Sequence, residues 1–227
     1  MATELTFLGH GSWAIKSGNY NVLLDPYLDE SPVAPVKSDE VSADYILISH
    51  GHFDHMADVV AIAHRTGATV VSNIEICTWL AEQQVEKTEQ MNIGGEISLP
   101  FGRVKMTMAH HSSGLPDGSD GGNPAGFLLK LDDATIYFAC DTALFLDMKL
   151  IGAAGIDLAV LPIGDRFTMG PDDAIEAVKL LGPRRVVPVH YNTWPPIEQD
   201  AQAWARRVEA HTAAEPVVIA PGEKITF

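Results

Sequence analysis

Cysteine is scarce in this sequence, and its scarcity excludes two ways of stabilising a fold. The chain of 227 residues contains two cysteines, Cys77 and Cys140, far apart and in no CxxC arrangement. A disulfide framework and a thiolate zinc knuckle are therefore both excluded. The simplest interpretation of both residues is that of small buried hydrophobic side chains.

Long apolar runs and basic clusters are missing as well. No run approaches the roughly 18 apolar residues of a membrane-spanning helix, and the N-terminus has no secretory signal pattern. The chain contains 15 Lys and Arg and 30 Asp and Glu, which gives a formal charge of −15. This charge argues against binding of nucleic acid through its phosphates. We therefore expect a cytoplasmic protein with no membrane or nucleic-acid partner.

Short apolar runs and turn residues follow one another in an order typical of an α/β fold. Three consecutive strands are predicted by ELTFLG, SWAIKS and NVLLDP. A strand, a helix and a strand are predicted by YILIS, MADVVAIAHRTG and ATVVS. Further strands are expected at RVKMTMA, GFLLKL, TIYFA, IDLAVLPI and RRVVPVH, and helices at IEICTWLAEQQ, 144–151, PDDAIEAVKLLGP and 199–211, before two closing strands.

Both halves of the chain place strands before helices, which suits two sheets packed face to face with helices outside. The predicted fold class is α/β, a four-layer αββα sandwich that forms a single domain over residues 1–227. One low-complexity segment, SSGLPDGSDGGNPAG at 112–126, is too rich in Gly and Asp for packing to be expected. We expect it to be mobile and to lie at the mouth of a pocket.

Three histidines and an aspartate crowd into six residues directly after a predicted buried strand. They are His50, His52, Asp54 and His55, in the stretch YILISHGHFDHMAD. Imidazole and carboxylate are the usual nitrogen and oxygen ligands of zinc and related ions. Two histidines at i and i+2 can converge on one ion, and Asp54 and His55 can serve a second. Packing explains this crowding poorly, so a two-metal site is predicted.

HGHFDH resembles the HxHxDH signature of the metallo-β-lactamase fold superfamily, and this resemblance implies three further ligands: a histidine after a later strand, a bridging aspartate, and a histidine after a late strand. AHHSSG offers His110 or His111, YFACDTALF offers Asp141, and VVPVHYNTWP offers His190. Alternation along VKMTMAHH places His110 on the same apolar face as the valine and methionines of that strand. The pattern alone leaves the choice between the two histidines open.

The whole chain is similar to small metal-dependent hydrolases of this fold, related to the L-ascorbate-6-phosphate lactonase group, whose DTALF, IGDxFTMGP and HYNT signatures are present. The family's histidine directly precedes the serine pair, which selects His111 and leaves His110 packed behind it. The resemblance implies a first metal held by His50, His52 and His111, a second held by Asp54, His55 and His190, and Asp141 bridging them.

The resemblance also implies roles for residues around the ligands. Asp25, at the end of NVLLDP, matches an early aspartate that fixes the metal-binding loop by accepting hydrogen bonds; a turn-forming Asp before Pro is the alternative. His10, in LGHGSW, would line the pocket or be an ordinary core or surface histidine. The predicted substrate contacts are Asp165, Thr168, Tyr191 and Asn192, with turn formation as the alternative for Asp165 and Asn192.

Two residues near the expected ligands are ambiguous. Cys140 stands where the relatives commonly carry glycine, and strand alternation turns its side chain away from the metals, so the change concerns the approach of the backbone. A thiolate ligand is the alternative. Trp194, before two prolines, would form a wall of the pocket or cover an edge of the core.

The predicted function is that of a metal-dependent hydrolase in which a metal-bound hydroxide cleaves a small ester, lactone or phosphoester. The cofactors would be one or two divalent ions, zinc or manganese, and the catalytic residues Asp54 and His190. The alternatives are a phosphodiesterase or nuclease, iron redox chemistry, and a non-catalytic metal-binding scaffold. The expected partner is a small-molecule substrate, and self-association into a homo-oligomer is left open.

Overall fold

The first of two seven-stranded sheets contains the first six strands of the chain and its last one. The computed structural model describes residues 2–227. The order in this sheet is β14-β1-β2-β3-β4-β5-β6, antiparallel as far as β3 and parallel from β3 to β6. Its strands are β1 (Glu4–Gly9), β2 (Ser12–Ser17), β3 (Tyr20–Leu24), β4 (Tyr45–Leu47), β5 (Thr69–Asn73), β6 (Thr88–Met91) and β14 (Lys224–Thr226).

The second sheet repeats this plan with the remaining strands. Its order is β13-β12-β11-β10-β9-β8-β7, antiparallel from β7 to β10 and parallel from β10 to β13. Carboxyl ends of parallel strands meet at one edge of a sheet, so each sheet gathers loops at such an edge. The strands are β7 (Glu96–Leu99), β8 (Gly102–Met108), β9 (Ala125–Lys130), β10 (Thr135–Phe138), β11 (Leu158–Pro162), β12 (Arg185–Val189) and β13 (Glu215–Pro216).

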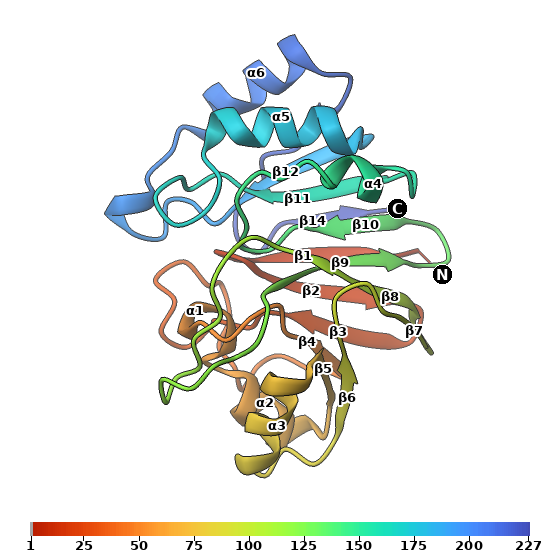
Figure 1. The fold of residues 1–227 in the computed structure, drawn as a ribbon, viewed down its shortest axis with the longest axis vertical. Helices are drawn as coiled ribbons and strands as arrows, with labels where there is room; N and C mark the ends of the chain where they lie inside the picture. The colour runs from red at the N-terminus through yellow and green to blue at the C-terminus, as the bar shows by residue number, and fades with distance from the viewer. Residues whose placement is uncertain (1) are drawn as a thin grey trace.

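Helices cover the outer faces of the two sheets (Figure 1). Helix α5 shows why the chain turns helical where it does. It begins with Pro171, carries two aspartates in its first turn, and ends before Gly182 at φ 58°, which are the expected start and stop signals. The helices are α1 (Phe53–Met56), α2 (Val59–Thr66), α3 (Ile74–Glu82), α4 (Met148–Gly152), α5 (Pro171–Leu181), the 3-10 helix η1 (Pro195–Ile197) and α6 (Ala201–His211).

Three apolar layers hold the four layers of backbone together. Along β10, Ile136 and Phe138 pack between the two sheets, whereas Tyr137 packs toward the helices of the second sheet, as the alternation of a strand requires. A third cluster, which includes Ile46 and Ile62, lies between the first sheet and its helices. The predicted four-layer αββα sandwich is confirmed.

The Gly-rich segment 112–126 packs against the fold, contrary to the prediction. Leu115 is buried in the cluster under the helices of the first sheet. The amide of Asn73 donates to the carbonyl oxygen of Gly121 at 2.7 Å, and the Ser113 hydroxyl accepts from the backbone of Gly51 at 3.0 Å. The segment has little apolar surface, so hydrogen bonds to its backbone and the buried side chain of Leu115 hold it in place.

Two further findings concern segments that the sequence patterns did not resolve. Strands β6 and β7 were not predicted, and the helix expected at 144–151 begins at Met148. Within residues 2–227, no helix combines the length and the apolar character that crossing a membrane requires.

Candidate metal centre

The seven predicted ligands meet at one edge of the sandwich, where strands of both sheets end. Four of them follow β4 of the first sheet, and three follow strands of the second sheet. His52 is the N-cap residue of α1, so the backbone turns helical directly after it. The first four are His50, His52, Asp54 and His55, and the others are His111 after β8, Asp141 after β10 and His190 after β12.

Backbone strain gathers around this edge. His10, Asp25, Cys140 and His190 have φ angles of 54°, 45°, 53° and 54°, in the left-handed region that residues other than glycine occupy at a cost. Each lies within two residues of the end of a strand. The strain thus makes sharp turns that direct side chains toward the centre, as is common at functional sites.

The first donor group contains three histidines and one aspartate oxygen. Nδ1 of His52 lies 3.0 Å from Nε2 of His50 and 3.3 Å from Nε2 of His111. Oδ2 of Asp141 lies 3.5 Å from Nε2 of His111 and 3.9 Å from that of His50. Tetrahedral ligands at 2.0–2.1 Å from zinc are about 3.3 Å apart, so these atoms have the spacing of coordinating donors.

The second donor group shares Asp141. Its Oδ2 lies 3.1 Å from Nε2 of His190, and its Oδ1 lies 3.5 Å from Nε2 of His55. Oδ2 of Asp54 lies 3.7 and 3.8 Å from the same two nitrogens. The buried Nε2 atoms of His55 and His190 have no hydrogen-bond partner among residues 2–227. A divalent cation fits such a group, because it would bind nitrogens that make no hydrogen bond together with the carboxylate oxygens that face them.

Asp25 makes the contacts expected of a residue that fixes the metal-binding loop. Its Oδ1 accepts from the backbone N–H of Ser49 at 2.8 Å, and its Oδ2 accepts from the Ser49 hydroxyl at 2.5 Å. Oδ2 also lies 2.9 Å from Nδ1 of His55. The Ser49 hydroxyl is 2.9 Å from Nδ1 of His50. One buried carboxylate thereby orients histidines of both groups. Sequence reasoning missed Ser49, although its place before the first ligand was a usable signal.

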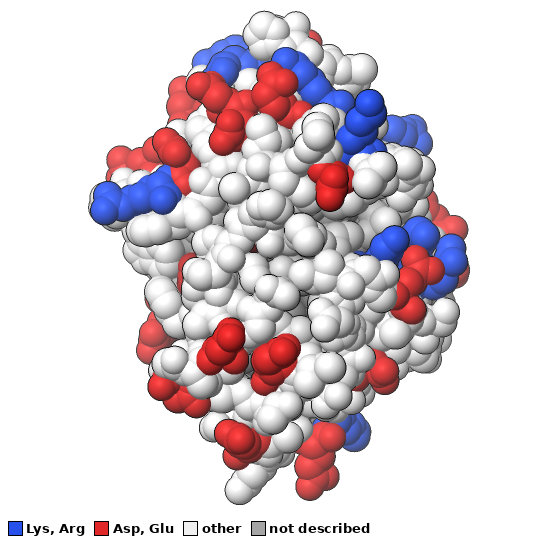
Figure 2. Space-filling view, viewed as in Figure 1, with Lys and Arg blue, Asp and Glu red and all other residues white. Residues whose placement is uncertain are grey.

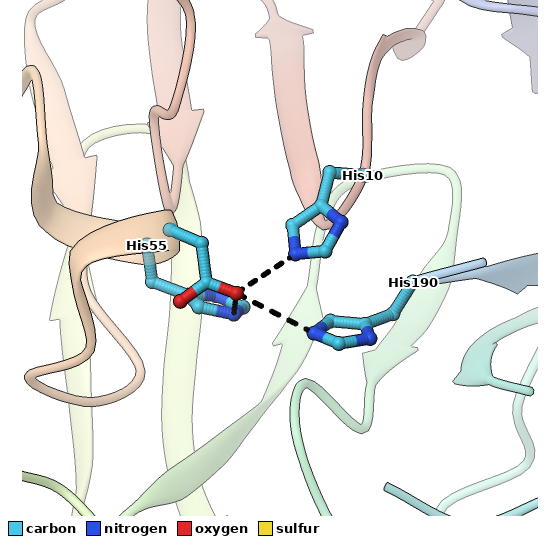
Figure 3. A group of neighbouring side chains, drawn as sticks. His10, His55 and His190 are labelled. Carbon is cyan, nitrogen blue, oxygen red and sulfur yellow. Dashed lines mark hydrogen bonds and ion pairs between the residues drawn. The ribbon is translucent and has the colours of Figure 1, made fainter. Parts of the chain in front are cut away.

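His10 connects the second donor group to the loop after β12. Its ring is buried, with Nε2 3.0 Å from Oδ2 of Asp54 and Nδ1 2.7 Å from the hydroxyl of Thr193. Figure 3 shows His10, His55 and His190 around one carboxylate oxygen. This oxygen is Oδ2 of Asp54, which lies 3.0, 3.8 and 3.7 Å from the Nε2 atoms of the three rings. Burial and the neighbouring His190 lower the pKa of His10 to about 4. A neutral ring can accept from Thr193 and donate from Nε2 to Asp54. No sequence signal pointed to Thr193.

The electrostatics of the two groups differ in the metal-free protein. Burial lowers the pKa values of His50, His52 and His111. Burial alone would do the same to His55 and His190, but Asp141 raises the pKa of His55 well above its usual value and that of His190 to about 9. The three histidines of the first group are thus neutral at pH 7, whereas His55 and His190 of the second group hold protons that a cation would displace.

His110 lies outside both donor groups and is not packed behind His111 as predicted. It is exposed and stacks on Phe145 with ring centroids 5.0 Å apart. The alternation of β8 fails near its end, because Met106 and Thr107 are both buried and Met108 is 44% exposed. Of the two candidates, the structure places His111 beside Asp141.

A cavity of about 670 Å³ opens over the donor groups. Its walls contain two residues from the predicted IGDxFTMGP loop, Arg166 and Phe167, which sequence reasoning did not single out. Trp194 also lines the cavity, so of its two predicted roles it has that of a pocket wall. The lining residues are His52, Phe53, Asp54, His111, Ser112, Gly114, Leu115, Pro116, Asp141, Arg166, Phe167, His190 and Trp194.

The four predicted substrate contacts do not line this cavity. The carbonyl of Asp165 accepts from the N–H of Thr168 at 2.7 Å, which closes a turn. The side chain of Asn192 accepts from the backbone of Gln199 at 2.7 Å. Tyr191 packs at the border of the core under the helices of the second sheet. Turn formation thus accounts for Asp165 and Asn192, because both have positive φ angles, 68° and 58°.

Cys140 has the backbone of a glycine position, and its thiol is outside the donor groups. Burial raises the pKa of the thiol, and the carboxylates of Asp25 and Asp141 raise it further. We therefore expect Cys140→Gly to keep the metal content of the wild-type protein. Elemental analysis of the two proteins after identical metal loading checks this; a variant that loses an ion would restore the thiolate alternative.

Comparison with known proteins identifies the family to which the chain belongs. A family model described as "Beta-lactamase superfamily domain" matches residues 20–191. A "UPF0173 metal-dependent hydrolase" of Heliobacterium modesticaldum is 47% identical over 232 residues, covering 99% of this chain and 97% of the relative. A UPF0173 metal-dependent hydrolase of Thermus thermophilus is also 47% identical, covering 97% of each chain.

A solved structure is similar over the full length. Igni18, described as a novel metallo hydrolase from Ignicoccus hospitalis, has a TM-score of 0.91 and 34% identity, covering 100% of this chain and 99% of its own. The chain therefore belongs to the beta-lactamase superfamily, among the UPF0173 metal-dependent hydrolases.

Proposed function

We propose that this metal-dependent hydrolase works with two divalent ions, zinc or manganese, and cleaves a small ester, lactone or phosphoester. The observation that carries the proposal is the place of Asp141, whose two oxygens lie between two separate groups of histidine nitrogens. His50, His52 and His111 would hold one ion, and Asp54, His55 and His190 the other. When bound, such ions acidify water and polarise a carbonyl or phosphoryl oxygen.

Asp54 has a positioning task in this proposal. Burial would raise the pKa of its carboxyl, but His55 and His10 hold that pKa far below its usual range. A carboxylate of this kind is a weak proton acceptor at neutral pH. Asp54 also lines the cavity, so it can orient a water molecule by accepting its hydrogen bond. His190 completes the same donor group from the opposite sheet.

The cavity supports a small substrate. Its volume is in the range of small-molecule sites, and Phe53, Leu115, Phe167 and Trp194 give it largely apolar walls. Figure 2 shows that basic side chains near α5 and α6 are mixed with acidic ones, and that the middle of this face carries few of either. A phosphodiester backbone would find no continuous basic track on the face shown.

The test uses the full-length protein and needs no knowledge of the natural substrate. We expect up to two ions per chain by elemental analysis. We also expect turnover of a p-nitrophenyl ester, a simple lactone or bis-p-nitrophenyl phosphate that a chelator abolishes and zinc or manganese restores. Full activity in the stripped protein would contradict the proposal.

Metal binding should release protons, and acid should weaken it. The pKa values of His55 and His190 are raised in the metal-free protein, the latter to about 9, so both rings are protonated at pH 7. An ion must displace these protons, and therefore binding strengthens as the pH rises toward 9 and weakens as it falls. Calorimetric titration in buffers of different ionisation enthalpy measures the release.

The same competition should limit catalysis in acid. We expect kcat/KM to fall below about pH 6 together with metal loss, because the ligands must be deprotonated. The acid limb should differ between zinc-loaded and manganese-loaded protein. Identical limbs for both ions would indicate an ordinary side-chain base.

A further inference from the structure

We propose that Arg166 and Phe167 form a recognition subsite for an anionic group of the substrate, a carboxylate or a phosphate, beside the metal centre. The inference rests on the proposed function and narrows its substrate class. The substrate would be a small ester, lactone or phosphoester with one negative charge away from the bond that is cleaved.

The position of the two residues is set by the backbone around them. They lie between β11 and α5, in a turn that the hydrogen bond between Asp165 and Thr168 closes. Directly after the turn, Met169 is buried, and its N–H donates to the carbonyl of Thr142 at 2.9 Å. The turn is therefore anchored beneath its tip. The two side chains at the tip line the cavity that also contains His52, His111 and Asp141.

The guanidinium of Arg166 is free to bind a ligand. Within residues 2–227 it makes no hydrogen bond and no ion pair. Three other arginines, Arg103, Arg184 and Arg207, have carboxylate partners. Arg166 instead lies over the ring of Phe167, 5.6 Å from its centroid. A guanidinium on an aromatic face keeps its hydrogen-bond donors available in a planar fork, which suits a carboxylate or a phosphate.

The charge of the cavity favours an anion at this position. Arg166 is the one Lys or Arg among the residues that line it, in a chain with a formal charge of −15. The acidic lining residues, Asp54 and Asp141, already face histidines. The remaining wall is largely apolar, so a charge-assisted hydrogen bond to Arg166 would be stronger than one in open water. A cationic group would find no equivalent partner.

Binding of amide ligands, which contain no ester, lactone or phosphoester bond, separates this inference from the proposed function. The probes are N-phenylbutanamide, N-phenylsuccinamic acid, in which a carboxylate replaces the terminal methyl, and N-phenyl-3-phosphonopropanamide. Their Kd values are measured by calorimetry on metal-loaded protein, for wild type, Arg166→Met and Arg166→Lys. The control is Arg206→Met, an exposed arginine of α6. Elemental analysis verifies equal metal content.

We expect Arg166→Met to weaken binding of at least one anionic probe by about tenfold and to leave the neutral amide within about twofold. Lysine should restore part of the affinity, and Arg206→Met should match wild type. The two anionic probes distinguish carboxylate from phosphate recognition. Equal changes for charged and neutral probes, or no change for either anion, would overturn the inference. Absence of turnover in every metal-loaded form would instead count against the proposed function, whatever the binding pattern.

Discussion

Asp141→Asn is expected to deplete both donor groups of metal and to lower kcat/KM by on the order of 10³-fold or more, which corresponds to losing several kcal/mol of electrostatic stabilisation. The reason is geometric. The carboxylate oxygens of Asp141 lie 3.1 to 3.9 Å from nitrogens of four histidines. An amide removes the negative charge that both groups share and places an N–H donor among those nitrogens.

The measurement is metal content by elemental analysis, with kcat/KM for whichever generic substrate the wild type cleaves. Asp147→Asn is the matched control, because Asp147 is exposed and its side chain does not cap α4. Circular dichroism of both variants verifies folding. A folded Asp141→Asn protein that retains two ions and full activity would contradict the bridging role.

His10→Ala should weaken binding of one ion by about 10- to 100-fold, the usual effect of removing a group that orients a metal ligand. The ring of His10 holds Oδ2 of Asp54 at 3.0 Å and is itself held by the hydroxyl of Thr193 at 2.7 Å. Without the ring, Asp54 loses a hydrogen bond and gains room to turn. The other ion, bound by His50, His52 and His111, should be retained.

Variants of Thr193 test whether its hydroxyl sets the orientation of His10. Thr193→Val keeps the shape of the side chain but removes the hydroxyl, so it should weaken binding of the same ion. Thr193→Ser should behave as wild type. His10→Gln, which keeps an N–H donor, should recover part of the affinity. The readouts are metal titrations and the visible spectrum of the cobalt-loaded protein. Equal affinities for the valine and serine variants would show that the hydroxyl does not set the orientation of His10.

The central strands and the longer helices were predictable because their burial follows a simple period. β11 is buried throughout, and α5 carries both its start and its stop signals. β6 and β7 were not predicted, since each has only four residues, TEQM and EISL, and Met91 is the one buried residue among them. Their pairing depends on neighbours that are distant in sequence, and alternation cannot show this.

The candidate ligands after β4 could be named from the sequence because they lie in a closely spaced motif after a strand, whereas the resemblance to the family supplied the later ligands and the choice of His111 over His110. Of the residues around them, Asp25 and Trp194 were also named from the sequence, but others were not. Thr193 and Arg166 acquire their places only when the loops after β12 and β11 fold over the edge of the sheets. Leu115 was missed for a related reason, because one apolar side chain in a Gly-rich segment gives no periodic signal. Substrate contact by Asp165 and Asn192 stays a prediction, because both residues lie in turns with positive φ angles and outside the wall of the cavity.

The residues with left-handed backbone conformation at the strand ends limit which substitutions can raise the stability of this protein without loss of activity. Each costs roughly 1–2 kcal/mol, and His10, Asp25, Cys140 and His190 together would amount to a large share of the roughly 5–15 kcal/mol that stabilises an ordinary domain. Selection for heat resistance alone would favour glycine at all four positions. At three of them glycine would delete a side chain of the metal centre, so thermal stability and activity oppose each other at this edge. Variants that gain stability without losing activity should therefore carry their substitutions in the helices and outer strands.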